Sequence, residues 1–493
     1  MNTYRRSLLM LFALLIRGVT PSLAQRNTSP IGTRSDLGNC STVLTTRDAA
    51  RCIGSIKIME PLPKINGTYR YALPELIDIA QNASPEGRIA WAEAKRSLES
   101  TGITRAEYLP LLILLGQGSD LRTIVPFPKP LAPRGYVTVE EPGVIAQLEL
   151  QYSLLDFGRG HRLEASKALE IASTLRLSRV HQTIAFNTAT QFYRVQQAIG
   201  QLEAARTIHE TAETLRKNAQ SQFDNGRATL PDVQNAIAGE AEARYNLASA
   251  EGEVRKAKLA LTEAIGIEPT TEINIAQESA QASESFETSV EELLKAAWKS
   301  RPDLLARAQD LRKAQENYQT ARAAYLPKVG FDATGGQTNL WPTADFGQLG
   351  PASVSTWQVA MQLHWDVFNG ARGHEQKAAL AEQQAAKETM RAAQDAVTRQ
   401  VWEAYTDYQT ALEEERSSKS FLTSSQTSYD SSLDAFNYGV RSLVDVVQAE
   451  RQLAQARLES VRAQARRLQT EVALSYATGQ MIAQNTSSSG ARP

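Results

Sequence analysis

The same series of motifs occurs twice in the sequence, and this internal repeat constrains the fold more than any other feature. The tripeptide Tyr-Leu-Pro occurs at Tyr108–Pro110 and again 217 positions later, at Tyr325–Pro327. Further on, "GRGH" at Gly158–His161 is answered by "ARGH" at Ala371–His374, now at an offset of 213 positions. Because a repeated segment builds the same substructure twice, the sequence predicts two copies of one structural unit.

Each copy has the same predicted order of elements: a short helix, a strand, a linker with Gly and Pro, a second strand, a very long helix, a Gly-containing turn and a final helix. No proline interrupts the chain between Pro142 and Pro231 or between Pro351 and Pro493. Helices from near residue 160 to 223 and from near residue 373 to 436 are therefore permitted, each about 95 Å long at 1.5 Å per residue. Several shorter helices, broken at positions such as Gly200, are the alternative.

The stretch "WQVAMQLHWDV", Trp357–Val367, alternates apolar and polar residues and therefore predicts a strand with two unlike faces. One face carries Trp357, Val359, Met361, Leu363 and Trp365, and the other carries Gln358, Gln362, His364 and Asp366. The stretch "AQLELQYSL", Ala146–Leu154, alternates in the same way in the first copy. Leu111–Gly118, which follows the first Tyr-Leu-Pro, is nearly all apolar and fits either a buried strand or a helical turn.

An apolar strand face with an aromatic residue at each end is typical of an outer-membrane β-barrel, whose strands need roughly 9–11 residues to cross the lipid. The alternative is a half-buried strand of a soluble sheet. Four strands cannot close a barrel, because the smallest bacterial barrels have eight and an open edge cannot face lipid. The membrane interpretation therefore requires that several chains share one barrel.

The N-terminus reads as a secretory signal peptide, residues 1–24, with Arg5 and Arg6 before an apolar run that is too short for a membrane anchor. Cys40 and Cys52 are the only cysteines. In an exported chain they are candidates for a disulfide, against two free thiols or, less plausibly, a lipid anchor on Cys40. The net charge of −1 comes from interspersed acids and bases, so no nucleic-acid partner is expected.

We expect six segments along the chain. They are the signal peptide (1–24), an N-terminal periplasmic segment (25–72), repeat 1 (73–267), an inter-repeat linker (268–286), repeat 2 (287–480) and a disordered C-terminal tail (481–493). The aromatic content of 7% is low, which favours extended helices over a compact aromatic core.

An enzyme is not expected. The five histidines show no metal-ligand spacing, and neither a nucleophile motif nor a Gly-rich phosphate loop is present, so no catalytic residue, metal site or cofactor is predicted. His161 and His374 match between the copies, and we interpret them as capping or packing residues at the starts of the long helices.

The duplicated plan, the two Tyr-Leu-Pro motifs, the GRG and ARG turns and the G-x-x-[ST]-x-x-D-V turns resemble the TolC-type outer-membrane efflux protein family, over roughly residues 73–480. The resemblance implies a mainly α fold with a small transmembrane β part. The duplicated strand–strand–long-helix–helix repeat would form, in a homotrimer, a shared twelve-stranded β-barrel and a long α-helical barrel. It also implies a place in the outer membrane, extending into the periplasm.

The resemblance implies partners and a site as well. The partners would be a periplasmic adaptor protein, an inner-membrane pump and outer-membrane lipid. The adaptor would dock at the helical turns, which hold Gly226, Thr229, Gly439 and Ser442. The closed end of the pore would involve Asp232, Phe436, Arg441, Asp445 and Gln448. In this family Asp445 corresponds to a pore acid and Arg441 to a base that pairs with the acid matched by Asp232.

This sequence departs from the family pattern at three of these places. Phe436 replaces a Tyr and lacks its hydroxyl, Gln448 replaces a second pore acid, and Pro231 replaces a Thr. A weaker lock and a less acidic constriction are therefore expected. The resemblance therefore implies that the protein is the exit duct of a tripartite efflux or type I secretion system. A soluble periplasmic coiled-coil scaffold or adaptor protein is the alternative.

Overall fold

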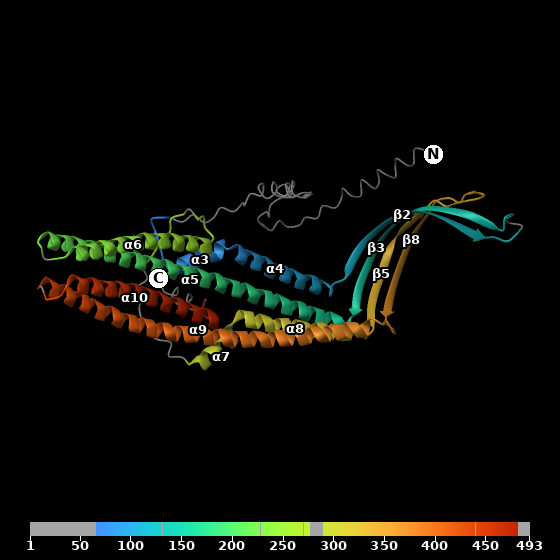
Figure 1. The fold of residues 1–493 in the computed structure, drawn as a ribbon. Helices are drawn as coiled ribbons and strands as arrows, with labels where there is room; N and C mark the ends of the chain where they lie inside the picture. The colour runs from blue at the N-terminus through green and yellow to red at the C-terminus, as the bar shows by residue number, and fades with distance from the viewer. Residues whose placement is uncertain are drawn as a thin grey trace, which may run out of the picture. The chain divides into compact units, whose positions relative to one another are not determined.

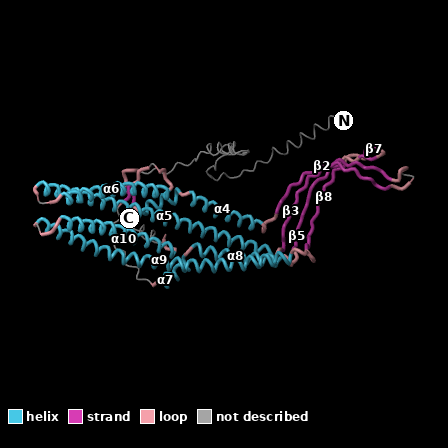
Figure 2. Tube along the Cα trace, in the orientation of Figure 1, coloured by secondary structure: helices cyan, strands magenta, loops and turns pink. Residues whose placement is uncertain are grey.

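The computed structural model describes residues 66–129, 132–226, 228–269, 271–276, 289–438 and 440–481. The predicted signal peptide, Cys40, Cys52, Gly439 and residues 482–493 of the predicted C-terminal tail lie outside these ranges, so the predictions made for them stay predictions. The described residues all belong to one unit. Within this unit the helices and the long strands occupy separate ends (Figure 1, Figure 2).

The two copies of the repeat build the same elements in the same order. The first copy contains α3 (Leu73–Ala83), α4 (Pro85–Ala106), β2 (Leu111–Pro126), β3 (Tyr136–Leu155), α5 (Phe157–Asp224) and α6 (Leu230–Ile265). The second contains α7 (Val290–Ser300), α8 (Pro302–Ala323), β5 (Lys328–Leu340), β8 (Ala352–His364), α9 (Arg372–Asn437) and α10 (Leu443–Thr478). We call two residues counterparts when they are 217 positions apart in α4 and α8, or 213 apart in the long helices and the helices that follow them.

Three short elements complete the fold. β1 (Arg70–Tyr71) pairs in parallel with β4 (Asn274–Ile275), and thereby joins the start of the first copy to the segment after α6. β6 (Thr343–Ala344) and β7 (Gly347–Gln348) form a small hairpin in the connection between β5 and β8.

Both long helices are continuous, as predicted. α5 has 68 residues and α9 has 66, so each extends for about 100 Å. α5 begins where the Asp156 carboxylate accepts a hydrogen bond from the Gly158 N–H (2.9 Å). Gly200 does not break α5. It lies against α10, where an added Cβ would come within 2.9 Å of Val461, so the residue allows two helices to approach closely.

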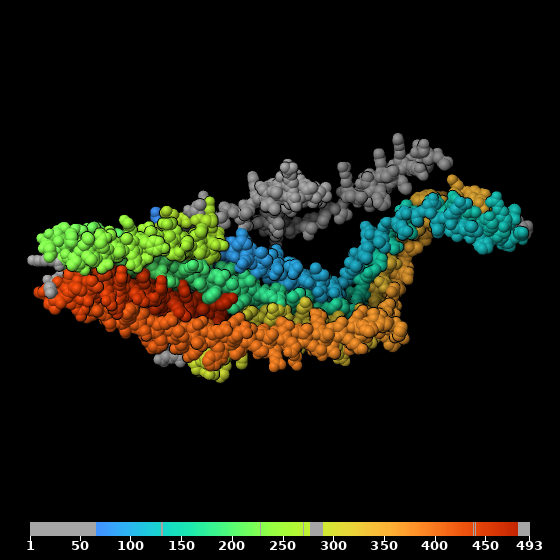
Figure 3. Space-filling model, in the orientation of Figure 1, coloured from blue at the N-terminus to red at the C-terminus, as the bar shows by residue number. Residues whose placement is uncertain are grey.

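The helices form a wall in which each helix packs on its neighbours. Near the sheet the order is α4, α5, α8, α9, and farther away it is α6, α5, α10, α9. The space-filling view shows the green α5–α6 hairpin lying along the orange-red α9–α10 hairpin (Figure 3). Apolar clusters hold the wall together in each copy: one gathers around Leu76, Phe192 and Leu261, and one around Leu293, Val401 and Leu474.

The strand predicted at Trp357–Val367 exists, but its predicted bounds are wrong. β8 starts five residues earlier, at Ala352, and ends three residues earlier, at His364. It ends there because its partner β5 begins at Lys328, opposite His364, and the residue before Lys328 is Pro327, which has no N–H to donate. Trp365 and Val367 therefore lie beyond the strand although they continue its alternation.

Candidate functional site

The sheet has the strand order β2, β3, β5, β8, and every neighbouring pair is antiparallel. Residues that pair directly across an antiparallel ladder lie on the same face of the sheet. The register therefore shows how the faces of the four strands continue one another. Figure 1 shows the strands side by side at the end of the unit that is remote from the two helical turns.

One face of this sheet is apolar across all four strands. The rows that cross it are Leu363 with Val329; Met361 with Phe331 and Tyr152; Val359 with Ala333, Leu150 and Leu112; and Trp357 with Gly335, Leu148 and Leu114. Within one chain this face is open: Trp357 is 81% and Leu363 69% exposed. Four of the five residues predicted to face lipid thus lie on one continuous apolar surface.

The fifth, Trp365, lies just after the strand. Its indole Nε1 donates a hydrogen bond to the Tyr325 carbonyl oxygen (3.2 Å), at the end of the sheet where the helices begin. An indole with an apolar body and a satisfied N–H suits the boundary between lipid and water. Trp365 therefore marks this end of the sheet without being part of the ladder.

The opposite face is mainly polar. Gln358 lies opposite Thr334, which lies opposite Glu149; His364 lies opposite Lys328. β2 is the exception, because Leu111, Ile113 and Leu115 lie on this face. The two interpretations left open for Leu111–Gly118 are thereby decided: the segment belongs to a strand, but this strand is exposed rather than buried.

The Tyr-Leu-Pro and GRG/ARG motifs meet where the strands join the long helices. The guanidinium of Arg159 lies over the Tyr108 ring (4.1 Å to the centroid) and donates to the Ser153 carbonyl oxygen (2.8 Å). Arg372, the counterpart of Arg159, lies over the Tyr325 ring (5.0 Å) and donates to the carbonyl oxygen of Asp366 (2.7 Å).

Both motifs are recognisable in the sequence, but their contact was not predicted. Each arginine fixes the end of one strand and the start of the next helix on the same tyrosine, through a cation–π contact and a hydrogen bond. The common spacing of the two motifs in the two copies was the signal that could have revealed this contact.

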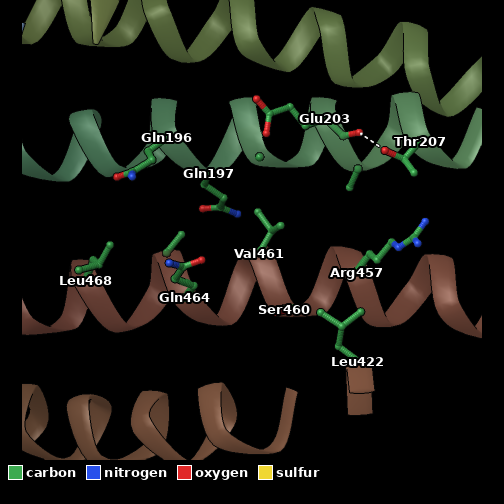
Figure 4. A pocket seen from close by; sticks show the side chains of 13 residues that line it. Gln196, Gln197, Glu203, Thr207, Leu422, Arg457, Ser460, Val461, Gln464 and Leu468 are labelled. Carbon is green, nitrogen blue, oxygen red and sulfur yellow. Dashed lines mark hydrogen bonds between the residues drawn. The ribbon is translucent and has the colours of Figure 1, made fainter. Parts of the chain in front are cut away.

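Between the sheet and the turns, α5 and α10 enclose a hollow of about 510 Å³, shown in Figure 4. Its lining is about equally polar and apolar, and Gln197, Gln464, Glu203 and Arg457 are among the polar side chains drawn there. This hollow lies at the close approach of Gly200 and Val461, so the helices touch at one level and separate around it.

At the far end of the wall, each copy turns from its long helix into the next helix. Gly226 has φ +68°, the left-handed conformation that glycine adopts at little cost, as predicted for this turn. Thr229 then starts α6, and both its N–H and its hydroxyl donate to the Asp232 carboxylate (2.9 and 2.6 Å). These bonds hold the pKa of Asp232 below its usual value.

The second turn repeats this arrangement. Ser442 starts α10, and its N–H and hydroxyl donate to the Asp445 carboxylate (3.2 and 2.9 Å). The Ser442 hydroxyl in turn accepts the Asp445 N–H, which completes a capping box. Thr229 and Ser442 therefore cap helices, as expected, and the two acids have a structural task in addition to any role in a pore.

The remaining predicted gate residues lie around these turns. Asp232 and Gln448 line one surface hollow between α6 and α10. Phe436 packs on the small apolar cluster of Leu215, Leu443 and Val446 that joins the two hairpins. The Arg441 guanidinium contacts the Ser432 hydroxyl (3.4 Å), and among the described residues of one chain no ion pair joins Arg441 to Asp232. The turns thus lie side by side, but the predicted ion pair is not made within a single chain.

In the part of the chain that the structure describes, no helix is apolar over enough residues to cross a bilayer. Over the same residues, no three His, Cys, Asp or Glu side chains are grouped as metal ligands would be. His161 instead contacts Glu316 of α8 (2.7 Å), which agrees with the packing role expected for it.

Comparison with known sequences gives a consistent result. The sequence model of a family described as "Outer membrane efflux protein" matches residues 76–267 and 293–480. The protein CyaE of Bordetella pertussis is 27% identical over 418 residues, which cover 83% of this chain and 84% of CyaE. The outer membrane protein TolC of Escherichia coli is 24% identical over 433 residues, 84% of this chain and 83% of TolC.

Comparison with solved structures shows the same fold. The outer-membrane channel OprN aligns with a TM-score of 0.69 at 17% identity, over 83% of this chain and 90% of OprN. At this identity the likeness concerns the fold alone. In the present chain this fold consists of long strands joined to a helical wall.

Proposed function

Because the chain belongs to the outer membrane efflux protein family, it is an outer-membrane efflux channel, and we propose that three copies of it close one conduit. In this assembly the four long strands of each copy supply a third of a twelve-stranded barrel. The helical walls continue the barrel into the periplasm. The channel is the exit duct of a tripartite efflux or type I secretion system and conducts its cargo passively.

The observation that carries this proposal is the open sheet with two unlike faces. In the described part of the chain, β2 and β8 each pair on one side only, so the unit has two free edges. In lipid every backbone N–H and C=O must be paired, which only a closed barrel achieves for strands. Four strands are too few to close, whereas three sets of four suffice to enclose a water-filled path lined by the polar face.

The helical wall supports the same closure. Its order ends at α4 and α6 on one edge and at α9 on the other, on the same sides as β2 and β8. A neighbouring copy that continues the sheet from β8 to β2 therefore also continues the wall from α9 to α4 and α6. Sheet and wall would then close together. The soluble scaffold considered as an alternative gives no reason for an apolar face that crosses four strands.

We further propose that the two helical turns form the periplasmic end of the conduit. Asp232, Phe436, Arg441, Asp445 and Gln448 would surround its constriction, and Gly226, Thr229, Gly439 and Ser442 would present the surface on which a periplasmic adaptor protein docks. The proposal is supported by the position of the described members of both sets, at the end of the wall farthest from the sheet (Figure 1). An inner-membrane pump would then deliver cargo through the adaptor.

The test of the proposal uses two adjacent residues of β8. Leu363 lies on the apolar face and Gln362 on the opposite face, opposite Gly330. Leu363→Arg would place a charge in lipid and should destabilise the barrel by about 2–4 kcal/mol, whereas Gln362→Arg would face water and should be tolerated. The measurement is the yield of assembled protein in the outer-membrane fraction. Equal yields of the two variants, or recovery of the wild-type protein from the soluble periplasm, would overturn the proposed membrane sheet.

A further inference from the structure

Because the wall is duplicated, each contact between two of its helices has a counterpart in the other copy. One such contact, which we call a joint, is made within a single chain, whereas its counterpart is not. α5 packs on α8, and this joint connects the first copy of the repeat to the second. The counterpart of α5 is α9 and the counterpart of α8 is α4, but these two helices are the free edges of the wall (Figure 1). The α5–α8 joint therefore serves as a template for whatever covers α9 and α4.

The long helices carry the same row of alanines at this joint. Ala165, Ala168 and Ala172 of α5 are buried, with exposed fractions of 6%, 1% and 0%. Their counterparts in α9 are again alanines, and each of them is exposed: Ala378, Ala381 and Ala385. α5 packs on α8, whereas within the described part of a single chain no helix covers these alanines of α9. Small side chains spaced along one helix face allow close packing of a second helix, and in α9 the second helix is missing.

The opposite side of the joint shows the same difference. Ala306 of α8 is 2% exposed, whereas its counterpart in α4, Ile89, is 60% exposed. Trp91 of α4 is likewise 60% exposed. A covered position on α8 thus corresponds to an uncovered apolar side chain on α4. The two uncovered faces, one rich in alanine and one with large apolar side chains, are complementary in size.

The joint also contains a histidine–carboxylate contact whose counterpart residues have the same chemistry. His161 Nδ1 of α5 lies 2.7 Å from the Glu316 carboxylate of α8. The counterparts are His374 on α9 and Glu99 on α4, so both partners are repeated, and both side chains are exposed in a single chain. The matched histidines, interpreted from the sequence as capping or packing residues, thereby gain a specific contact.

We propose that α9 of one copy packs on α4 of the next in the register of α5 on α8, with His374 against Glu99 of the neighbouring copy. The inference rests on the proposed assembly of three copies and adds the surface and the register through which they meet. A row of alanines and a histidine–carboxylate contact then occur six times around the conduit, three times within chains and three times between them.

The other polar contacts of the template are not repeated, which distinguishes the two kinds of joint. Arg312 pairs with Glu164 inside the chain (2.9 Å), but the counterparts are Lys95 and Lys377, which carry like charges. Arg176 pairs with Asp310, and the counterpart of Arg176 is Thr389. The joint between copies therefore contains fewer ion pairs than the joint within a chain. The contact of His374 with Glu99 is the polar contact that both joints share, and it defines the register.

The test is cross-linking by a short bis-maleimide in the full-length protein, purified in detergent, with Cys40 and Cys52 replaced by serine. The variant His374→Cys/Glu99→Cys should lose its monomer band and give a band of three chains, because each copy supplies both residues of a closed ring. His161→Cys/Glu316→Cys is the matched control, which should react within one chain and stay monomeric. His374→Cys/Glu86→Cys is the off-register control, since residues 86 and 99 are about 20 Å apart along a helix.

The outcomes distinguish a failure of the proposed register of α9 on α4 from a failure of the proposed assembly of three copies. A trimer by native mass spectrometry that does not cross-link through residues 374 and 99, while the internal control reacts, would overturn the register and leave the assembly intact. Stronger cross-linking through residues 374 and 86 would also overturn the register. A monomeric wild-type protein would overturn the proposed assembly and with it this inference.

Discussion

The α5–α6 and α9–α10 hairpins have nearly the same lengths and the same type of capped turn, and both end at a left-handed glycine. Different side chains, however, hold the two helices of each hairpin together. α10 buries Arg467 (4% exposed), which pairs with Glu415 of α9 (2.8 Å, 9% exposed) and with Glu471 (2.9 Å). The counterparts of Arg467 and Glu415 in the first hairpin are Val254 and Leu202. A buried ion pair and an apolar pair thus occupy the same place in one fold.

The junctions before α4 and α8 differ in the same way. Ser84 begins α4 with a small side chain. Its counterpart, Arg301, is 2% exposed and donates to the Asp303 carboxylate (2.6 Å), to the Gln400 side-chain oxygen (2.8 Å) and to the Ala477 carbonyl oxygen (3.2 Å). Arg301 thereby ties the start of α8 to α9 and to the end of α10. Both copies form the same elements, one with small or apolar side chains and one with charged side chains at these places. The charges of the second copy are therefore not needed to form the junction or the hairpin.

The difference between the copies suggests that the second copy depends more on specific partners. Apolar contacts tolerate small shifts, whereas a buried charge is stable only with its partner in place. Removal of a single partner should therefore cost more in the second copy than the matching change in the first. Replacement of a whole pair should cost little.

The largest expected effect is at the junctions. Arg301→Ala should lower the free energy of unfolding by about 3 kcal/mol, because it leaves the Gln400 and Ala477 oxygens without their donor and opens a cavity. Ser84→Ala should cost only about 1 kcal/mol, the usual cost of a lost N-cap. Guanidinium unfolding followed by circular dichroism, at one protein concentration in detergent, measures both. Equal losses would mean that the two junctions are equivalent despite their different chemistry.

A smaller effect is expected in the hairpin. Arg467→Val should destabilise the protein by about 2 kcal/mol, because Glu415 stays buried with only Lys419 beside it (2.9 Å). The double variant Glu415→Leu/Arg467→Val gives the second hairpin the residues of the first and should regain most of this loss or exceed the wild type. The same unfolding experiment applies. If the double variant is as unstable as the single one, the surroundings of the pair in α9 and α10 are adapted to charge.

These contrasts also show what the sequence could predict. The long helices followed from the missing prolines, and the apolar face followed from alternation, because both patterns are local. The burial of Arg301 could not be predicted: an arginine before Pro302 has the sequence context of an exposed residue. It is buried only because α9 and the end of α10 converge on it. Arg467 and Glu415 are 52 positions apart and look like ordinary exposed helix charges in the sequence.

In the functional site, too, the features that depend on neighbouring residues could be predicted and those that depend on distant segments could not. The caps at Thr229 and Ser442 were predictable because each cap and its acid are three residues apart in the sequence. The end of β8 was not, since it depends on Pro327, the residue that precedes β5, and neither was the contact of each Tyr-Leu-Pro tyrosine with an arginine beyond two strands. Contacts between distant segments are therefore the part that needed the structure.

The third prediction concerns pH. Burial raises the pKa of Glu450 in α10 above its usual value, whereas its counterpart in α6 is Ile237, which does not titrate. A carboxyl whose pKa is higher in the folded than in the unfolded chain costs stability as the pH rises from the usual Glu pKa of about 4.3 through the raised value. Glu450→Gln should remove this cost. Thermal unfolding at pH 4 and pH 7 should show a gain over the wild type at pH 7 only.

A gain at both values of pH would attribute the effect to packing rather than to ionisation. A loss at pH 7 would mean that the charged Glu450 is stabilised in the folded protein, with Arg451 and Arg457 the basic side chains near enough to act on it. Glu459→Gln is a suitable control, because Glu459 is more exposed on the same helix and pairs locally with Arg462 (3.1 Å).

The smallest expected effect per residue lies at the turns, where Arg441 of the second copy has Ala228 as its counterpart in the first. Within one chain Arg441 reaches only the Ser432 hydroxyl among the described contacts of its side chain, and the Asp232 carboxylate accepts hydrogen bonds from Thr229. We expect Arg441 to pair with Asp232 across the closed end of the assembled channel. An exposed pair of this kind contributes about 0.2–1 kcal/mol, and three pairs by symmetry contribute about 0.6–3 kcal/mol.

Such a total is small enough for a docking adaptor to overcome, and it could still shift the open population from several-fold to about a hundredfold. Arg441→Ala, which makes the second turn resemble the first, should therefore raise the conductance of single channels in planar bilayers, most clearly at low salt, where charges are least screened. Asp232→Ala should do the same and add little in the double variant. Arg462→Ala, which removes a helix-surface pair away from the turns, should leave the conductance unchanged. Wild-type conductance of Arg441→Ala at low salt would show that packing around Phe436, and not the ion pair, holds the end of the channel closed.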